Sequence, residues 1–294
     1  MDFMTTTFKF EAIGTKWVID IYEDLSADEA GALLLKKIME RIEEFDKNYS
    51  RFRDDSLVMK MSRKAGEFEL PPDADKMISI YKKMYDVTGG LVTPLIGQVL
   101  SDAGYDAKYS LKKGELSKPK SWGEVIEWKN PKLILKESAL LDFGAGGKGY
   151  LVDIVSEILE NKGVDSYCVD AGGDMRHRSS KSESLKVGLE HPTDKESVIG
   201  VLPLLNKSLC GSAGNRRVWG DFHHIIDPQK LSSPKEILAV WVLADDTLTA
   251  DILTTGLFFV PTETLLKHYK FEYLIVKSGY SIEKSEGFDA EIYT

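Results

Sequence analysis

The sequence has 294 residues, of which 43% are hydrophobic and 29% charged, a composition typical of soluble globular proteins. Its 38 basic and 47 acidic residues give a net charge of −9, which argues against a nucleic-acid partner because such a partner favours a basic surface. No apolar run reaches the roughly 18 residues that a membrane-spanning helix needs, so no membrane span is expected.

The start of the chain is rich in β-forming residues. Residues 8–24 alternate partly between apolar and polar side chains and predict one or two strands. No basic segment followed by an apolar one is visible, so no signal peptide is expected and a cytoplasmic location is predicted, unless a lipoprotein signal has been truncated. Cys168 and Cys210 lie in separate apolar runs and are expected to be buried free thiols, in keeping with a reducing compartment.

Two helices are predicted in the next part of the chain. The clearer one covers residues 26–49, where Ser26 and Glu29 form a plausible capping box. Its apolar residues recur every three or four positions: Ala30, Leu34, Ile38, Ile42, Phe45 and Tyr49. The second helix covers about 72–87 and ends at the turn residues Thr88, Gly89 and Gly90.

Residues 101–131 are rich in Gly, Lys and Ser and predict an irregular surface excursion. Beyond them, helices are expected at 148–161 and 247–260, and a hairpin at 273–285. Strands are expected at 132–137, 139–143, 166–173, 184–192, 197–205, 208–214 and 237–246. Because these strands come in runs between helices, the order predicts an α+β fold with mixed, largely antiparallel sheets and packed helices. We expect one domain over residues 1–294.

A glycine-rich loop lies between the strand expected at 139–143 and the helix expected at 148–161. Gly144, Gly146 and Gly149 have the spacing G-x-G-x-x-G, and Asp170 follows about 20 residues later, as in a dinucleotide-binding fingerprint. Asp142 would repel a bound pyrophosphate unless a cation lay between them. The pattern leaves three interpretations open: a Rossmann loop, a tight strand–helix turn, or a loop that faces another ligand.

Two further segments contain candidate site residues. Arg216 and Arg217 could contact phosphates, and His223 and His224 would point in opposite directions on a strand, so that one of them could face a cleft.

Asp251 and Thr255 are four residues apart on a predicted helix and therefore share a face, where they could offer oxygen ligands to Mg²⁺. The alternative is structural, with the Asp favourably placed near a helix N-terminus and the Thr bonded to a carbonyl.

Taken in order, these segments resemble the FAD:protein FMN transferases, or ApbE family. The resemblance runs from about residue 8 to 276, through the segments 12–17, 50–56, 88–94, 141–153, 170–176, 212–217, 223–228 and 249–259. It implies an ApbE-like fold and a Mg²⁺-dependent enzyme. Such an enzyme splits FAD, attaches FMN through a phosphoester to a Thr or Ser of a target flavoprotein, and releases AMP.

The resemblance also implies residue roles. Asp251 and Thr255 would be catalytic and would bind the metal together with the main-chain oxygen of Gly147. The residues that would contact the FAD are Ile13, Phe52, Leu91, Val92, Thr93, Tyr150, His224, Ile226 and Asp227.

The sequence departs from the family pattern around the flavin and acceptor sites, at Ile13, Thr93, Ala213 and Arg216. Two alternatives to transfer activity stay open, the first because of these departures and the second because of the dinucleotide fingerprint. One is a flavin-binding protein or FAD pyrophosphatase that does not transfer FMN. The other, more remote, is an NAD-dependent oxidoreductase.

Overall fold

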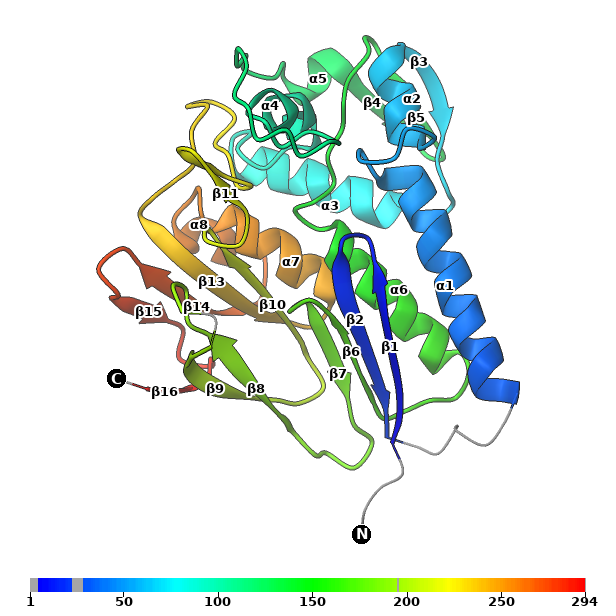
Figure 1. Cartoon of the computed structure of the whole chain (residues 1–294), viewed down its shortest axis with the longest axis vertical. Coiled ribbons are helices and arrows are strands. Elements are labelled where there is room, and N and C mark those ends of the chain that lie inside the picture. The colour runs from blue at the N-terminus through cyan, green and yellow to red at the C-terminus, as the bar shows by residue number, and fades with distance from the viewer. Residues whose placement is uncertain (1–4, 23–28, 195, 294) are drawn as a thin grey trace.

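The computed structural model describes residues 5–22, 29–194 and 196–293 (Figure 1). Its largest element is an eight-stranded sheet in the order β1-β2-β6-β7-β10-β13-β14-β15. Each neighbouring pair in this sheet is antiparallel. The strands are β1 (Thr6–Ala12), β2 (Thr15–Ile21), β6 (Tyr167–Ala171), β7 (Met175–Arg178), β10 (Ser208–Ala213), β13 (Ile237–Ala244), β14 (Glu272–Lys277) and β15 (Ile282–Lys284).

Smaller antiparallel sheets surround the main one in the described chain. One has the order β16-β9-β8, formed by Glu291–Ile292, Val198–Leu204 and Leu185–Glu190. Another has the order β3-β5-β4, formed by Gly66–Glu69, Lys132–Leu135 and Ile126–Lys129. The third pairs β11 (Val218–Trp219) with β12 (Phe222–His223).

The helices lie mainly on one face of the main sheet (Figure 1). Helices α6 and α7 contact each other and strands of this sheet, while α1 packs on α6 and α3 on α7. The helices are α1 (Glu29–Tyr49), α2 (Leu57–Arg63), α3 (Ala74–Val87), η1 (Pro94–Ile96), α4 (Gly97–Asp102), α5 (Trp122–Val125), α6 (Gly147–Glu160), α7 (Thr247–Gly256) and α8 (Thr262–Leu266). In the described residues, no helix is both long enough and apolar enough to cross a bilayer.

Alternation along β13 separates two hydrophobic cores. Val240 and Val242 face the helices, whereas Ala239 and Trp241 face the sheet β16-β9-β8. The main sheet is therefore covered on one face by helices and, over part of the other face, by a second sheet.

The periodicity that predicts α1 is confirmed. The apolar positions from Leu34 to Tyr49 are buried at three- and four-residue spacing, while Ala30 is exposed. The expected capping residue Ser26 lies outside the described residues. Both cysteines are buried and free, as expected.

Two local predictions are wrong. Residues 139–143 form no strand, so the chain enters the glycine-rich loop as irregular backbone. The irregular excursion is shorter than expected, because α5 and β4 occupy much of its second half. The fold class is confirmed, and the antiparallel strand pairs exclude the parallel doubly wound sheet that the dinucleotide fingerprint implies.

Candidate active site

A cleft of about 340 Å³ opens where the glycine-rich loop, the end of β10 and α7 meet. Segments far apart in the sequence form its walls, among them the β1–β2 turn and residues 91–93. The predicted site residues that line it are Phe52, Leu91, Val92, Thr93, His224, Ile226, Asp251 and Thr255. The structure therefore brings most of the predicted site together.

Asp251 and Thr255 both face this cleft from α7, as their spacing predicts. The Asp251 side chain is buried, and one of its carboxylate oxygens accepts a hydrogen bond of 2.9 Å from the Gly149 N–H. Burial raises the pKa of Asp251, against the opposing effects of Lys148 and of that hydrogen bond. Since an ionised carboxylate is costly to bury without a counter-charge, a bound cation would stabilise the ionised form.

The donor atoms around Asp251 suit a hard cation. Among the described residues, no group of three or more His, Cys, Asp or Glu forms a metal site by itself. A metal at Asp251 would therefore also use hydroxyl or main-chain oxygens, which Mg²⁺ accepts. Thr255 lines the same cleft, whereas Gly147 lines an adjoining hollow of about 330 Å³.

The glycine-rich loop allows α6 to pack closely on α7. A Cβ at Gly149 would lie 2.2 Å from the Thr247 carbonyl oxygen and 2.7 Å from the Asp251 Cβ, whereas one at Gly147 would meet no atom closer than 3.8 Å. The last glycine of the fingerprint is thus required by contact between two helices. The presence of a glycine at this position is therefore explained without a bound dinucleotide.

Asp153 of α6 fixes the start of α7. Its carboxylate oxygens accept hydrogen bonds of 2.9 Å from the backbone N–H groups of Thr247 and Leu248, which are otherwise free at a helix N-terminus. Asp246 caps the same helix by accepting from the Thr249 N–H at 2.8 Å. Together these contacts hold the helix that carries Asp251.

Three cationic side chains line the cleft: Lys148, Arg216 and Arg217. Lys148 forms an ion pair with the buried Asp174, and Arg216 forms one of 3.0 Å with Glu190. Carboxylates thus already pair with Lys148 and Arg216, whereas Arg217 lies with its guanidinium over the Tyr105 ring at the cleft and is the cation best placed to meet a polyanionic ligand such as a pyrophosphate. Both arginines line the cleft, and that they contact phosphates stays a prediction.

The two adjacent histidines occupy different environments. His224 lines the cleft, while the ring of His223 bonds to the Pro234 carbonyl oxygen at 2.8 Å. Because β12 ends at His223, the predicted alternation along a strand does not account for this difference. The Nδ1 atom of His224 is buried without a hydrogen-bond partner in the described structure. Burial, reinforced by Arg217, lowers the pKa of His224 to about 3, so the ring is neutral at neutral pH.

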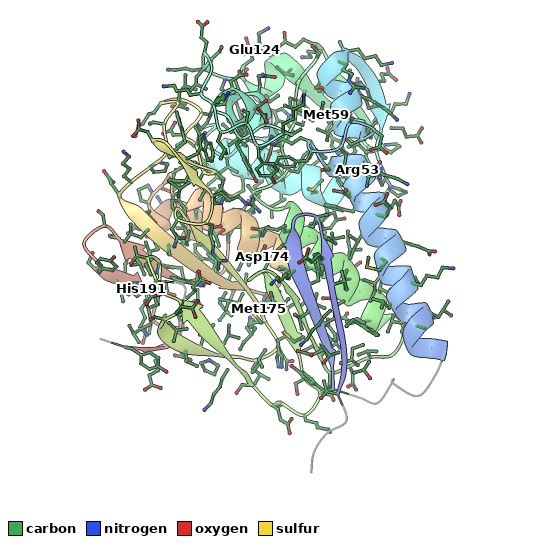
Figure 2. The ribbon with its side chains drawn as sticks, in the orientation of Figure 1. Arg53, Met59, Glu124, Asp174, Met175 and His191 are labelled. Atoms are coloured by element: carbon green, nitrogen blue, oxygen red, sulfur yellow. The ribbon has the colours of Figure 1, made fainter. Side chains whose placement is uncertain are left out.

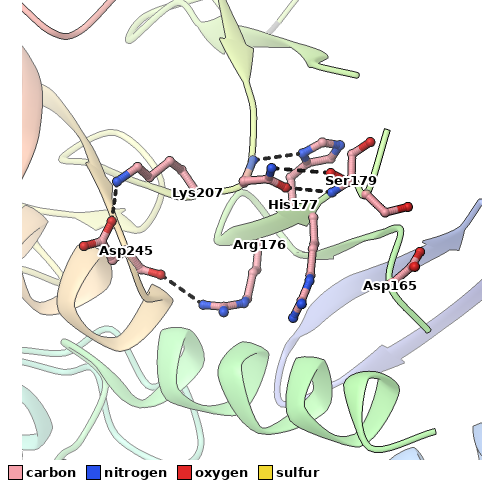
Figure 3. A pocket seen from close by; sticks show the side chains of 9 residues that line it. Asp165, Arg176, His177, Ser179, Lys207 and Asp245 are labelled. Atoms are coloured by element: carbon pink, nitrogen blue, oxygen red, sulfur yellow. Dashed lines mark hydrogen bonds and ion pairs between the residues drawn. The ribbon is translucent and has the colours of Figure 1, made fainter. Parts of the chain in front are cut away.

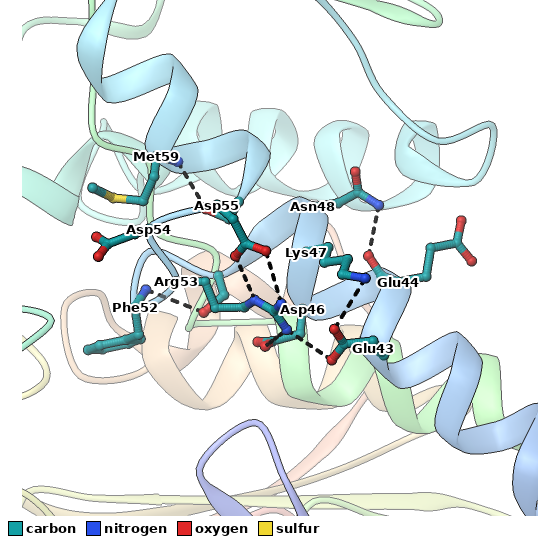
Figure 4. Close-up of polar contacts among 12 residues, drawn as sticks. Glu43, Glu44, Asp46, Lys47, Asn48, Phe52, Arg53, Asp54, Asp55 and Met59 are labelled. Atoms are coloured by element: carbon teal, nitrogen blue, oxygen red, sulfur yellow. Dashed lines mark hydrogen bonds and ion pairs between the residues drawn. The ribbon is translucent and has the colours of Figure 1, made fainter.

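The segment that carries Phe52 is held between α1 and α2 by an exposed charge network (Figure 4). Arg53 donates to Glu43, Asp46 and Asp55 at 2.9 to 3.0 Å. The network ties the segment back to α1. Phe52 is then free to contact Tyr105 and Tyr109, and these three rings line the adjoining hollow.

Sequence reasoning missed Arg51, which is buried beside this hollow. It donates to Asp142 at 2.5 Å and to the Tyr105 carbonyl oxygen at 2.7 Å. Asp142 in turn accepts from the Gly144 N–H at 2.7 Å. The cation that Asp142 requires is thus supplied, at least in part, by the protein itself. No local pattern predicts this pair, because its members are 91 residues apart.

Comparisons with known proteins agree with this geometry. The model of the ApbE family matches residues 13–275. The chain belongs to the ApbE family.

Relatives of this ApbE-family chain include proteins named FAD:protein FMN transferase. The one from Escherichia coli K12 is 24% identical, with 95% of this chain and 86% of the relative covered. The one from Haemophilus influenzae is also 24% identical, with 95% and 89% covered.

Solved structures share the fold. The flavin transferase ApbE from Vibrio cholerae has a TM-score of 0.81 at 19% identity, with 97% of this chain and 98% of that one covered. The ApbE protein from Thermotoga maritima has a TM-score of 0.84 at 22% identity, with the same coverage.

Besides Gly147, three predicted site residues of this ApbE-family chain lie outside the central cleft. Ile13 lines the adjoining hollow. Tyr150 is buried and donates from its hydroxyl to the Asp73 carbonyl oxygen at 2.6 Å, so its ring packs in the core. Asp227 accepts from the backbone N–H groups of Gln229 and Lys230 at 2.8 Å and stabilises a turn. For Tyr150 and Asp227, the structure places neither side chain along the cleft or the hollow.

A separate cavity of about 500 Å³ lies beside β7 and holds none of the predicted site residues (Figure 3). Its basic side chains are paired: Lys207 contacts the Asp245 carboxylate, Arg176 donates to the Asp245 carbonyl oxygen at 3.1 Å, and Arg178 pairs with Glu160 at 2.8 Å. These pairings leave little free positive charge for an anion.

Proposed function

We propose that this chain is a Mg²⁺-dependent flavin transferase that cleaves FAD and attaches FMN to a Thr or Ser of an acceptor flavoprotein. In this reaction the acceptor hydroxyl oxygen bonds to the FMN phosphorus, the bond from that phosphorus to the bridging oxygen breaks, and AMP leaves with the bridging oxygen. The observation that carries the proposal is one cleft that combines Asp251 and Thr255 with three cationic side chains. The curated relatives named for this activity support it.

In this proposal Asp251, Thr255 and the main-chain oxygen of Gly147 hold the Mg²⁺. The buried carboxylate with its raised pKa fits this role, because a doubly charged ion would restore its ionised form. When bound, Mg²⁺ supplies charge neutralisation and polarisation at the phosphoryl group. Arg217 adds positive charge along the cleft, whereas Lys148 is paired with Asp174.

The remaining residues would orient the nucleotide and the acceptor. The aromatic hollow formed by Phe52, Tyr105 and Tyr109 offers flat apolar surfaces to a ring of FAD. The imidazole of His224, with a pKa of about 3, is too weak a base to take up the proton that the acceptor hydroxyl loses, so that proton would pass to solvent or to the departing AMP. Its Nδ1, which has no partner in the described structure, would instead accept a hydrogen bond from a bound group. Leu91 and Val92 would pack against the flavin as the family resemblance implies.

The direct test is incubation with FAD, Mg²⁺ and a candidate acceptor flavoprotein, followed by intact mass spectrometry of the acceptor and measurement of AMP. A mass gain equal to FMN supports transfer. AMP without that gain supports the second candidate, an FAD pyrophosphatase, which the departures Thr93 and Ala213 at the cleft wall keep in consideration. If neither FMN-labelled acceptor nor AMP is formed, the proposal is contradicted. Calorimetry should also show binding of FAD in preference to NAD⁺.

A further inference from the structure

A groove of about 550 Å³ extends from the cleft along the other face of the main sheet. The groove opens directly into the cleft, because six residues line both of them. These residues are Thr15, Gly172, Gly211, Ser212, Ala213 and Arg216. At this junction the Ser212 hydroxyl lies 2.8 Å from that of Thr254, which in turn donates to the Asp251 carbonyl oxygen at 2.6 Å. The groove therefore ends beside Thr254, which precedes Thr255 in α7 and is hydrogen-bonded to Asp251.

Strand β8 forms one wall of this groove. It pairs with β9 on one side and is the edge of its sheet in the described chain. Four consecutive residues, 185–188, line the groove, although their side chains alternate between the two faces of the sheet. The groove therefore runs along the edge of the strand. An edge strand presents unpaired backbone N–H and C=O groups that can pair with another chain.

The opposite wall and the floor fit an extended chain. The start of β2, at Thr15 and Lys16, and the β6–β7 turn form the opposite wall, with Gly172 and Gly173 at positive φ of 67° and 100°. Met175, Leu209 and Trp241 supply apolar surface. Met175 and His191, which both line the groove, are labelled in Figure 2.

We propose that the groove binds an extended segment of the acceptor protein, which pairs edge-to-edge with β8 and brings its Thr or Ser hydroxyl to Ser212 and Ala213. This inference rests on the proposed transferase function. Main-chain hydrogen bonds along the six residues of β8 would supply affinity with little dependence on sequence. The Arg216–Glu190 ion pair, which spans the junction, would set which side chains are accepted near the hydroxyl.

The test uses two pools of synthetic peptides about ten residues long, enough to cover β8 at roughly 3.3 Å per residue. Each peptide has one central Thr with randomised flanks, and in the second pool the flanking backbone nitrogens are methylated. The peptides are incubated with enzyme, FAD and Mg²⁺. Flavin-labelled peptide is measured relative to AMP released, so that any change in FAD cleavage itself is divided out.

A variant adds bulk to a residue that lines the groove. Gly188→Tyr places a large side chain on the exposed wall; its Cβ would lie 3.0 Å from Val198 Cγ1, and Val198 is 43% exposed and can move aside. Gly123→Tyr is the matched control, since Gly123 is exposed, lies outside the groove and has no atom within 4 Å of an added Cβ. Melting temperatures of both variants verify folding.

We expect wild-type enzyme and Gly123→Tyr to label the unmethylated pool, and about tenfold less labelling per AMP with the methylated pool or with Gly188→Tyr. Equal labelling of both pools would overturn the pairing with β8, even if Gly188→Tyr fails to fold. AMP release without labelling of either pool would also overturn it, and would leave FAD cleavage intact. Absence of AMP would instead contradict the proposed function and, with it, this inference.

Discussion

Gly149→Ala tests whether close packing of α6 on α7 positions Asp251. The added Cβ would lie 2.2 Å from the Thr247 carbonyl oxygen, so the start of α7 would have to move by roughly 1 Å to restore ordinary contact. Overpacking of this kind costs about 1–3 kcal/mol, of which up to about 1 kcal/mol is offset by the better helix propensity of alanine. We therefore expect a net loss of about 1–2 kcal/mol in the free energy of unfolding, measured by urea denaturation.

The same movement would displace the Asp251 carboxylate, which accepts from the Gly149 N–H. A misplacement of about 1 Å at a reacting group can cost on the order of 100-fold in rate, so AMP release from FAD should fall by a comparable factor. Gly147→Ala is the stability control on the same helix, because its Cβ would meet no atom closer than 3.8 Å. Wild-type stability and AMP release in Gly149→Ala would refute this account of the glycine-rich loop.

Three further predictions concern buried polar groups. Arg51→Ala leaves Asp142 without its buried partner and should lower the free energy of unfolding by about 3 kcal/mol in urea denaturation; a loss below about 1 kcal/mol would contradict this role. Asp153→Ala removes two hydrogen bonds at the start of α7 and should cost about 2–3 kcal/mol by the same measurement, whereas an unchanged midpoint would argue against the cap. For His224 the folded-state pKa of about 3 lies below the ordinary value of 6.5, so its contribution to stability is complete above pH 6.5 and is lost as the pH falls toward 3. Relative to His224→Asn, the wild type should lose about 2 kcal/mol between pH 7.5 and pH 5, and parallel stability curves would show that the imidazole is not held neutral.

The sequence predicts the parts of the structure that depend on local periodicity. The buried positions of α1 and the shared face of Asp251 and Thr255 follow directly from 3.6 residues per turn. The run of strands between helices likewise predicts the antiparallel sheets, because strict alternation with helices is what a parallel sheet requires.

The features that the sequence did not predict depend on contacts between distant segments. In the segment 139–143, Leu141 and Phe143 are buried, yet the chain forms no strand there. A short apolar run in the sequence does not distinguish a paired strand from a buried segment without regular structure. The Arg51–Asp142 pair and the groove along β8 arise only when the chain is folded, so neither leaves a local pattern.

The family resemblance implies roles for individual residues, and the structure shows which of these residues line the cleft. Most of the residues it named line the central cleft, but Tyr150 and Asp227 have structural partners instead. A motif transfers the position of a residue in the chain, whereas the direction of its side chain depends on local packing. The metal set of Asp251, Thr255 and Gly147 stays a prediction until a metal is bound.

Release of AMP from FAD, measured for wild type and for Asp251→Ala with and without EDTA, tests the central claim most directly. The account predicts AMP release by the wild type in Mg²⁺, its loss on addition of EDTA, and its near-complete loss in Asp251→Ala, because the variant removes the carboxylate that faces the cleft. Thr255→Ala should lose less, since water can replace a neutral hydroxyl. Full activity of Asp251→Ala, or wild-type activity that is indifferent to EDTA, would contradict a Mg²⁺-dependent reaction in this cleft.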